Sequence, residues 1–158
     1  MPATFWGRVA YILERNGESF LRGAGNTMLI ALVSTFIGCI IGFAVGIVQT
    51  IPTDRKKNPI KWVLIGIVKF ILNVYVVVFR GTPMMAQAMF IYFGSSCLFN
   101  INMSMWFAAI LIVSINTGAY MAETVRAGIK SIDVGQREGA LALGMSPLKA
   151  MVVVIIPQ

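Results

Sequence analysis

The sequence predicts an all-α, polytopic helical membrane protein. Of its 158 residues, 58% are hydrophobic and only 12% are charged, with a mean hydropathy of +0.81. A soluble domain of this length has about half apolar and a quarter charged residues. Long apolar runs alternate with short segments that hold most of the Lys and Arg side chains. This distribution is typical of several helices that cross a bilayer.

The charged and sulfur-containing residues exclude several other classes of protein. The formal net charge is +7, but the basic residues are scattered over loop positions without a basic aromatic patch. They are better explained by orientation in a bilayer than by a nucleic-acid partner. The chain has no His, and Cys39 and Cys97 are isolated in apolar stretches. We therefore expect no nucleic acid, no metal site, no disulfide framework and no cofactor bound by this chain.

The amino-terminal part is predicted to hold an interfacial segment, 1–26, followed by a first span, 27–48. Residues 1–26 mix charged and aromatic side chains too finely to cross a membrane. Residues 27–48 carry no charge, and their 22 positions are enough to cross about 30 Å of hydrocarbon. Gly38, Gly42 and Gly46 repeat every fourth residue, which favours close packing by a second helix. The alternative is that glycine is simply frequent in membrane helices.

Residues 62–79 are apolar, but whether they cross the membrane has to be decided by charge. The basic segment 54–61 is expected in the cytoplasm by the positive-inside rule, which places the amino terminus outside. Lys69 and Asn73 interrupt 62–79. If this segment and the next one both crossed, the basic loop 123–149 would lie outside. We therefore expect 62–79 to lie along the cytoplasmic interface.

Two further spans are predicted at 82–98 and 106–122. Gln87 lies in the middle of the second span and needs a hydrogen-bond partner or a water-lined cavity. Asn116, Tyr120 and Glu123 lie three to four residues apart and therefore share one helical face. Two interpretations stay open for these four residues: they line a polar path for a solute, or they bond neighbouring helices. Glu123 and Arg126 are also spaced to pair with each other.

The segment 131–157 is the one polar, Gly- and Ala-rich stretch between apolar runs. Asp133 is a helix N-cap, and Ser146 followed by Pro147 starts a second helix. Pro157 lacks the backbone donor that would continue that helix. The sequence therefore predicts two short helices that meet at a turn at Gly144 and present small side chains to a partner.

Three motifs resemble the membrane subunits of binding-protein-dependent ABC importers. In 138–157 the order Glu, two small residues, three residues, Gly, nine residues and a terminal apolar-Pro pattern is similar to the cytoplasmic coupling loop of that family. RGTPMMAQAMFIYFG at 80–94 and AYMAETVRAGIKSIDVGQREGA at 119–140 resemble the polar amino-acid permeases of the histidine and glutamine type. The resemblance implies that Glu138, Gly139, Ala140 and Gly144 lie in a coupling helix that docks on an ATPase subunit, and that Pro157 belongs to the same coupling loop. Gly139, Val154 and Ile156 depart from the pattern, which has Ala, Ile and Leu there.

The resemblance also implies a function. The chain would be the permease subunit of an importer in the bacterial cytoplasmic membrane, moving a polar amino acid by alternating access. Its partners would be ABC ATPase subunits that bind ATP and Mg, a second permease chain as homo- or heterodimer, an extracytoplasmic solute-binding protein and the lipid bilayer. Region 27–158 would form the transmembrane domain with three of the family's five spans. The expectation is therefore a fragment or a truncated product.

The alternatives are a permease for another small solute and an ATP-independent channel or secondary transporter. An ATP-independent carrier has no need of small-residue docking helices, so the loop 131–157 favours the importer. The chain is not expected to be an enzyme. It contains no G-x-x-x-x-G-K-[ST] sequence to hold nucleotide phosphates, and no Ser-His, Cys-His or paired-carboxylate arrangement can be assembled from its residues.

Overall fold

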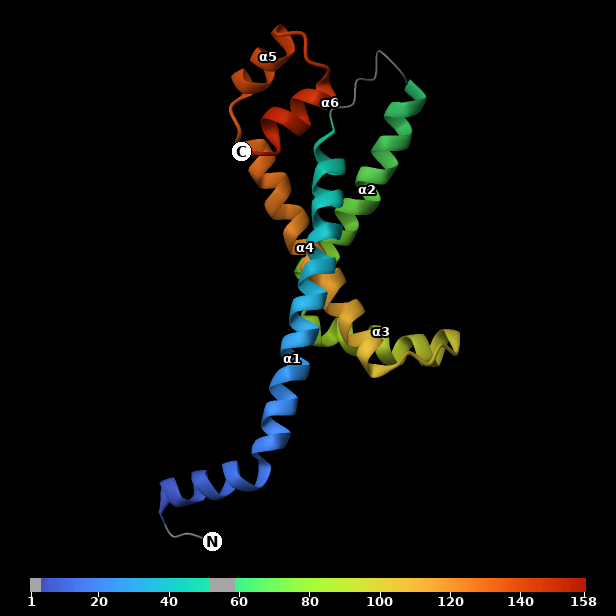
Figure 1. Cartoon of the computed structure of the whole chain (residues 1–158). Helices are drawn as coiled ribbons and strands as arrows, with labels where there is room; N and C mark the ends of the chain where they lie inside the picture. Colours follow the sequence, from blue (N-terminus) through green and yellow to red (C-terminus); the bar gives the residue numbers. More distant parts are fainter. Residues whose placement is uncertain (1–3, 52–58) are drawn as a thin grey trace.

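The computed structural model describes residues 4–51 and 59–158, and every element in those ranges is a helix. The long helices are α1 (Phe5–Thr50), α2 (Pro59–Gly81) and α4 (Met105–Ser131), with the shorter α3 (Met84–Phe99) between α2 and α4. Helices α5 (Val134–Ala142) and α6 (Pro147–Ala150) follow, and the chain continues into a π-helical turn, η1 (Met151–Ile155). Figure 1 shows α1, α2 and α4 crossing near the middle of the molecule, with α5 and α6 beyond the end of α4. The all-α fold class is confirmed.

The main packing surface joins α1 to α4 along the three glycines predicted to form a ridge. A Cβ atom added at Gly38 would lie 2.7 Å from Cβ of Thr117, and one at Gly46 would lie 2.8 Å from Cβ of Val125. At Gly42 the distance to Cβ of Met121 would be 2.4 Å. Real Cβ atoms do not approach so closely, so the two backbones are in contact because these positions are glycine. The glycine ridge therefore serves packing, as predicted.

Helix α2 differs from the predicted interfacial segment. It has 23 residues and is apolar enough to cross a membrane by length and composition. Lys69, which argued against a span, donates a hydrogen bond from Nζ to the carbonyl oxygen of Ile51 at 2.5 Å. Ile51 is the C-cap of α1, where carbonyl groups lack helical partners and the helix dipole favours a cation. The lysine is thus accommodated by the end of a neighbouring helix, and its charge does not prevent α2 from crossing.

Among the described residues, the helices that can cross a membrane by length and composition are α1, α2 and α4. They do not coincide with the predicted set, because α2 takes the place of 82–98. Helix α3 extends to the side of α1, α2 and α4 in Figure 1. With 16 residues it is shorter than the helices that count as candidates to cross a membrane. Helix α1 is also longer than predicted, since 5–26 continue into the span without interruption. Of the predicted basic segment 54–61, residues 54–58 lie outside the described residues and 59–61 form the start of α2.

Candidate functional site

Gln87 and Asn116 form a polar junction where α2 ends. Nε2 of Gln87 donates to the carbonyl oxygens of Phe79 (2.9 Å) and Thr82 (3.0 Å). Nδ2 of Asn116 donates to the same Phe79 carbonyl (3.2 Å) and to Oε1 of Gln87 (3.1 Å). Gln87 is buried. These bonds satisfy carbonyl groups that a helix end leaves free, so in this structure Gln87 and Asn116 join α2, α3 and α4.

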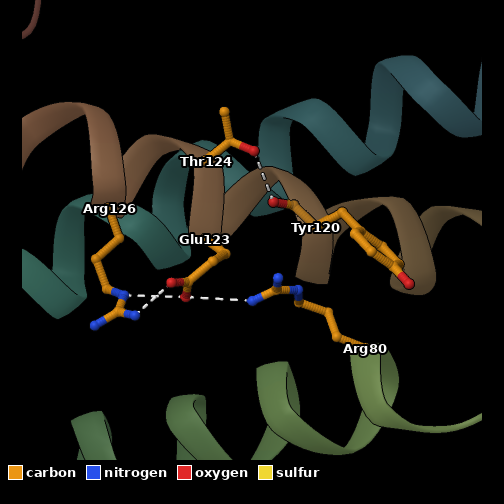
Figure 2. A network of polar contacts seen from close by, with 5 residues as sticks. All are labelled: Arg80, Tyr120, Glu123, Thr124 and Arg126. Carbon is orange, nitrogen blue, oxygen red and sulfur yellow. Dashed lines mark hydrogen bonds and ion pairs between the residues drawn. The ribbon is translucent and has the colours of Figure 1, made fainter.

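Glu123 is held between two arginines from different helices. Its carboxylate accepts two hydrogen bonds from Arg126, one of them from Nε at 3.1 Å, and pairs with Nη1 of Arg80 at 3.7 Å. Figure 2 shows the carboxylate between the two guanidinium groups, with Arg80 reaching over from α2. The predicted pairing of Glu123 with Arg126 is confirmed. The Arg80 pairing is the longer of the two and is solvent-accessible, since its side chains are 41% and 27% exposed.

Tyr120 completes this group on the accessible side. Its side chain is exposed, and the guanidinium carbon of Arg80 lies 5.6 Å from the centre of its ring. Asn116, Tyr120 and Glu123 all contact residues 79–80 of α2. The predicted shared face is therefore real and turns toward the end of α2. Asn116 is engaged by internal hydrogen bonds with Gln87 of α3 and Phe79 of α2, whereas Tyr120 is exposed and Glu123 is half-buried and paired with two arginines.

Arg80 is the site residue that sequence reasoning did not include. It is the last basic residue of an apolar helix and directly precedes the Gly-Thr-Pro break. A signal was present, because a charged side chain at such a position needs a counter-charge in its surroundings. Its carboxylate partner on the facing helix α4, Glu123, is 43 positions along the chain, a separation that no local pattern reveals.

The segment after α4 folds as the two predicted short helices. The carboxylate of Asp133 caps α5 by accepting from the backbone N–H of Gly135 at 2.7 Å. Gly144 has φ +80, a backbone conformation that favours glycine. The N–H groups of Gly144 and Met145 return to the carbonyls of Leu141 and Ala140, which is a Schellman ending for α5. The turn at Gly144 is confirmed.

The second short helix also follows its sequence signals. Oγ of Ser146 accepts from the backbone N–H of Lys149, and Pro147 occupies the first helical turn. The helical conformation continues through η1 and gives way to a turn at Ile156 and Pro157. Ala140 of α5 and Ala150 of α6 are buried at 5% and 1% exposure. These two small side chains let the short helices pack against each other.

The predicted coupling residues divide by position within this two-helix element, which comprises residues 133–157. Glu138, Gly139, Gly144 and Pro157 are exposed, whereas Ala140 is buried inside. A groove of about 480 Å³ lies between α5 and η1 and is lined by Asp133, Gly135, Gln136, Gly139, Ala140, Leu143, Met145 and Val154. The element therefore offers an exposed, small-residue surface at one end of the molecule (Figure 1).

Comparison with known proteins supplies the family. Residues 64–158 match the model of the family described as binding-protein-dependent transport system inner membrane component. The chain belongs to this family. The match includes α4 and the two-helix element, as well as the polar residues at the end of α2.

Similar proteins include transporters of amino acids. The chain is 38% identical to the arginine transport system permease protein ArtQ of Bacillus subtilis and 35% identical to the glutamine transport system permease protein GlnP of Escherichia coli K12. Each alignment covers 87% of this chain and 58% of the relative. The chain thus spans a little over half the length of these relatives.

Solved structures share the fold. A chain from the crystal structure of an amino acid ABC transporter with histidines superposes with a TM-score of 0.76 at 32% identity, covering all of this chain and 65% of the other. The MetNI methionine ABC transporter gives a TM-score of 0.68 at 22% identity, covering 92% of this chain and 64% of the other. The predicted permease fold is confirmed.

Proposed function

We propose that this chain is the membrane-spanning permease subunit of an ATP-binding cassette importer for a polar amino acid. The observation that carries the proposal is the two-helix element, which exposes Glu138, Gly139 and Gly144 at one end of a helical membrane protein. An element of this kind suits docking to a separate ATPase, which would bind ATP and Mg and hydrolyse the nucleotide. A second permease chain and an extracytoplasmic solute-binding protein would complete the transporter.

Helix α4 gives the two candidate sites a direct mechanical connection. Glu123 lies on the same uninterrupted helix that ends at Ser131, about 12 Å farther along its axis. Only Ile132 and the cap Asp133 separate that end from α5. We infer that movement of the two-helix element by an ATPase reaches Glu123 through α4, and α1 moves with α4 because their backbones touch at the glycine ridge.

The charges favour one orientation in the bacterial cytoplasmic membrane. With α1, α2 and α4 crossing, the two-helix element and the basic segment 54–61 lie on the same side, which the positive-inside rule places in the cytoplasm. The amino terminus then lies outside. A cysteine at position 138, in a chain without Cys39 and Cys97, should react with an impermeant maleimide only after the membrane is opened. Reaction in intact cells would refute this orientation.

The substrate class is inferred from the relatives and from the part of the polar face at Tyr120 and Glu123. The relatives named above transport arginine and glutamine. Glu123 can meet the ammonium group of an amino acid, and Arg80 can meet its carboxylate, because the Arg80–Glu123 pair at 3.7 Å is longer than a hydrogen bond. Tyr120 adds an accessible aromatic face. Gln87 and Asn116 would support this site by fixing the end of α2, which carries Arg80.

Retention of an ATPase tests the coupling role. We would purify the tagged chain from its native membranes and assay the preparation for an ABC ATPase by mass spectrometry and ATP hydrolysis. Glu138→Arg and Gly144→Arg should each remove the ATPase. Ser131→Arg introduces the same side chain at the exposed last residue of α4, with the same change in charge as Gly144→Arg, and should retain the ATPase. An ATPase that stays bound to both coupling variants would refute the assignment.

Binding of labelled amino acids to the purified transporter tests the substrate site. Glu123→Gln should reduce binding at least tenfold, because it removes the carboxylate that two arginines hold in place. Glu18→Gln is a matched control, since Glu18 also pairs with an arginine, Arg22 at 2.8 Å, but lies on exposed α1 far from the site. Unchanged amino-acid binding in the Glu123 variant, with its thermal stability preserved, would exclude Glu123 from the path.

A further inference from the structure

The amino-terminal part of α1 has two chemically distinct faces. At about 100° per residue, Trp6, Val9, Leu13 and Phe20 fall on one side, where Phe5, Ile12 and Ala24 extend the apolar surface. The opposite side carries the charged residues and a tyrosine: Arg8, Tyr11, Glu14, Arg15, Glu18 and Arg22. The continuation of α1 from 27 to 48 has no charge on any side. The two-faced pattern therefore belongs to residues 5–24 alone.

No described part of the protein covers the apolar face of this segment. Trp6 is 77% exposed and Phe20 is 58% exposed. Figure 1 shows the dark-blue end of α1 turned aside from the rest of the helix, at the end of the molecule opposite α5 and α6. Because residues 5–24 continue directly into an apolar helix long enough to cross a bilayer, they must lie close to a membrane surface.

Three glycines in or just after this segment support a change of direction near its end. An added Cβ at Gly17, Gly23 or Gly25 would meet no atom within 4 Å, in contrast to the crowded glycines of the α1–α4 contact. Packing therefore does not require glycine at these positions. Gly lowers helix stability by about 1 kcal/mol relative to Ala, which makes this stretch the easiest place for α1 to bend.

The charges on the polar face are largely engaged with one another. Arg22 pairs with Glu18 at 2.8 Å, and Nη1 of Arg15 donates to the hydroxyl of Tyr11 at 2.8 Å. Three arginines against two glutamates leave residues 5–24 with a net formal charge of +1. Attraction to anionic lipid grows with the number of uncompensated basic residues. One such charge contributes little compared with the apolar face.

We propose that residues 5–24 form a membrane-surface helix that lies in the lipid–water interface and bends into the α1 span at Gly23–Gly25. Its Trp6, Leu13 and Phe20 face enters the boundary between headgroups and acyl chains, and its Arg15, Glu18 and Arg22 face stays in water. Apolar burial holds the helix there, so zwitterionic lipid is sufficient. The proposal goes beyond the transport function and does not depend on it.

Spin-label accessibility in vesicles tests the proposal. The full chain, with Cys39→Ala and Cys97→Ala, would be labelled at Leu13→Cys or Phe20→Cys on the apolar face and at Glu18→Cys or Ser19→Cys on the polar face. It would then be reconstituted in pure phosphatidylcholine. Labels on the apolar face should collide with oxygen and be shielded from a water-soluble nickel complex. Labels on the polar face should show the reverse.

Three outcomes would overturn the proposal. Nickel access on both faces would mean a helix surrounded by water. Shielding of the apolar face from both reagents would mean that protein, such as a second copy of the chain, covers it. Apolar-face insertion only with added phosphatidylglycerol, or its loss in 0.5 M salt (about a 4 Å Debye length), would mean attachment by charge.

A pair of charge variants checks that the apolar face is the cause. Phe20→Glu in the Leu13-labelled chain should raise nickel access at least threefold by pulling the segment out of the interface. Ser19→Glu adds the same charge to the polar face and should change it little. Equal effects of both variants would refute the assignment of faces, and unchanged α-helical circular dichroism would show that neither variant unfolds the chain.

Discussion

Replacing Gly42 by Ala tests the α1–α4 contact most directly. The added Cβ would lie 2.4 Å from Cβ of Met121, 2.8 Å from the carbonyl oxygen of Gly118 and 2.9 Å from the backbone nitrogen of Ala122. Carbon atoms pack at about 3.5–4.0 Å, so the helices must separate locally by about 1 Å. Two of the three atoms belong to the α4 backbone, and a rotamer change cannot move them. The methyl group therefore forces a shift of a whole helix.

The expected cost is that of overpacking a tight contact, about 2 kcal/mol. For a chain of this size, that loss lowers the melting temperature by about 4 to 8 °C. We would follow the monodisperse fraction of the detergent-solubilised protein by size-exclusion chromatography after heating.

Gly66→Ala is the matched control for the glycine contact. An added Cβ at Gly66 in α2 meets nothing within 4 Å, and Ala is the better helix former by about 1 kcal/mol. The control should be as stable as the parent or more so. If Gly42→Ala and Gly66→Ala had the same melting temperature, the backbones of α1 and α4 would not be in contact and the reasoning would fail.

Two further substitutions test local features. Gln87→Leu should destabilise the protein by about 1–3 kcal/mol, since it leaves buried partners at the end of α2 unsatisfied. Asn116→Ala should then lower the melting temperature less in the Gln87→Leu background than in the parent protein. Additive losses of melting temperature would contradict the shared network. Gly144→Ala should lower the free energy of unfolding by about 1–2 kcal/mol because of its positive φ, and it should speed hydrogen–deuterium exchange across 134–150. Gly128→Ala, in open space on α4, should leave this exchange unchanged. Slow exchange in the Gly144 variant would argue against the turn.

Sequence reasoning succeeded where the determining interactions are local. The caps at Asp133 and Ser146 and the turn at Gly144 each depend on atoms within a few residues, so their patterns predict the two-helix element almost position by position. The glycine ridge was also predicted, since glycines at every fourth position identify a packing face. The spacing does not identify the helix that packs on it. What sequence did not supply was the pairing of distant residues: Arg80 with Glu123 and Lys69 with Ile51 depend on how α1, α2 and α4 cross.

The revised set of crossing helices also shows what the charge rule constrains. Positive charge at 54–61 and at 123–149 requires an even number of crossings between the two segments. With the helix at 106–122 taken as one crossing, exactly one of the apolar segments 62–79 and 82–98 can be another. The rule does not say which. Sequence reasoning kept 82–98 and placed 62–79 at the interface, but helix α2, which contains 62–79, has 23 residues and rises about 34 Å, against about 24 Å for the 16 residues of α3. Only the longer helix matches a hydrocarbon core of about 30 Å. If α2 is the crossing helix, both basic segments still lie on one side, so the inferred orientation is the same for either choice.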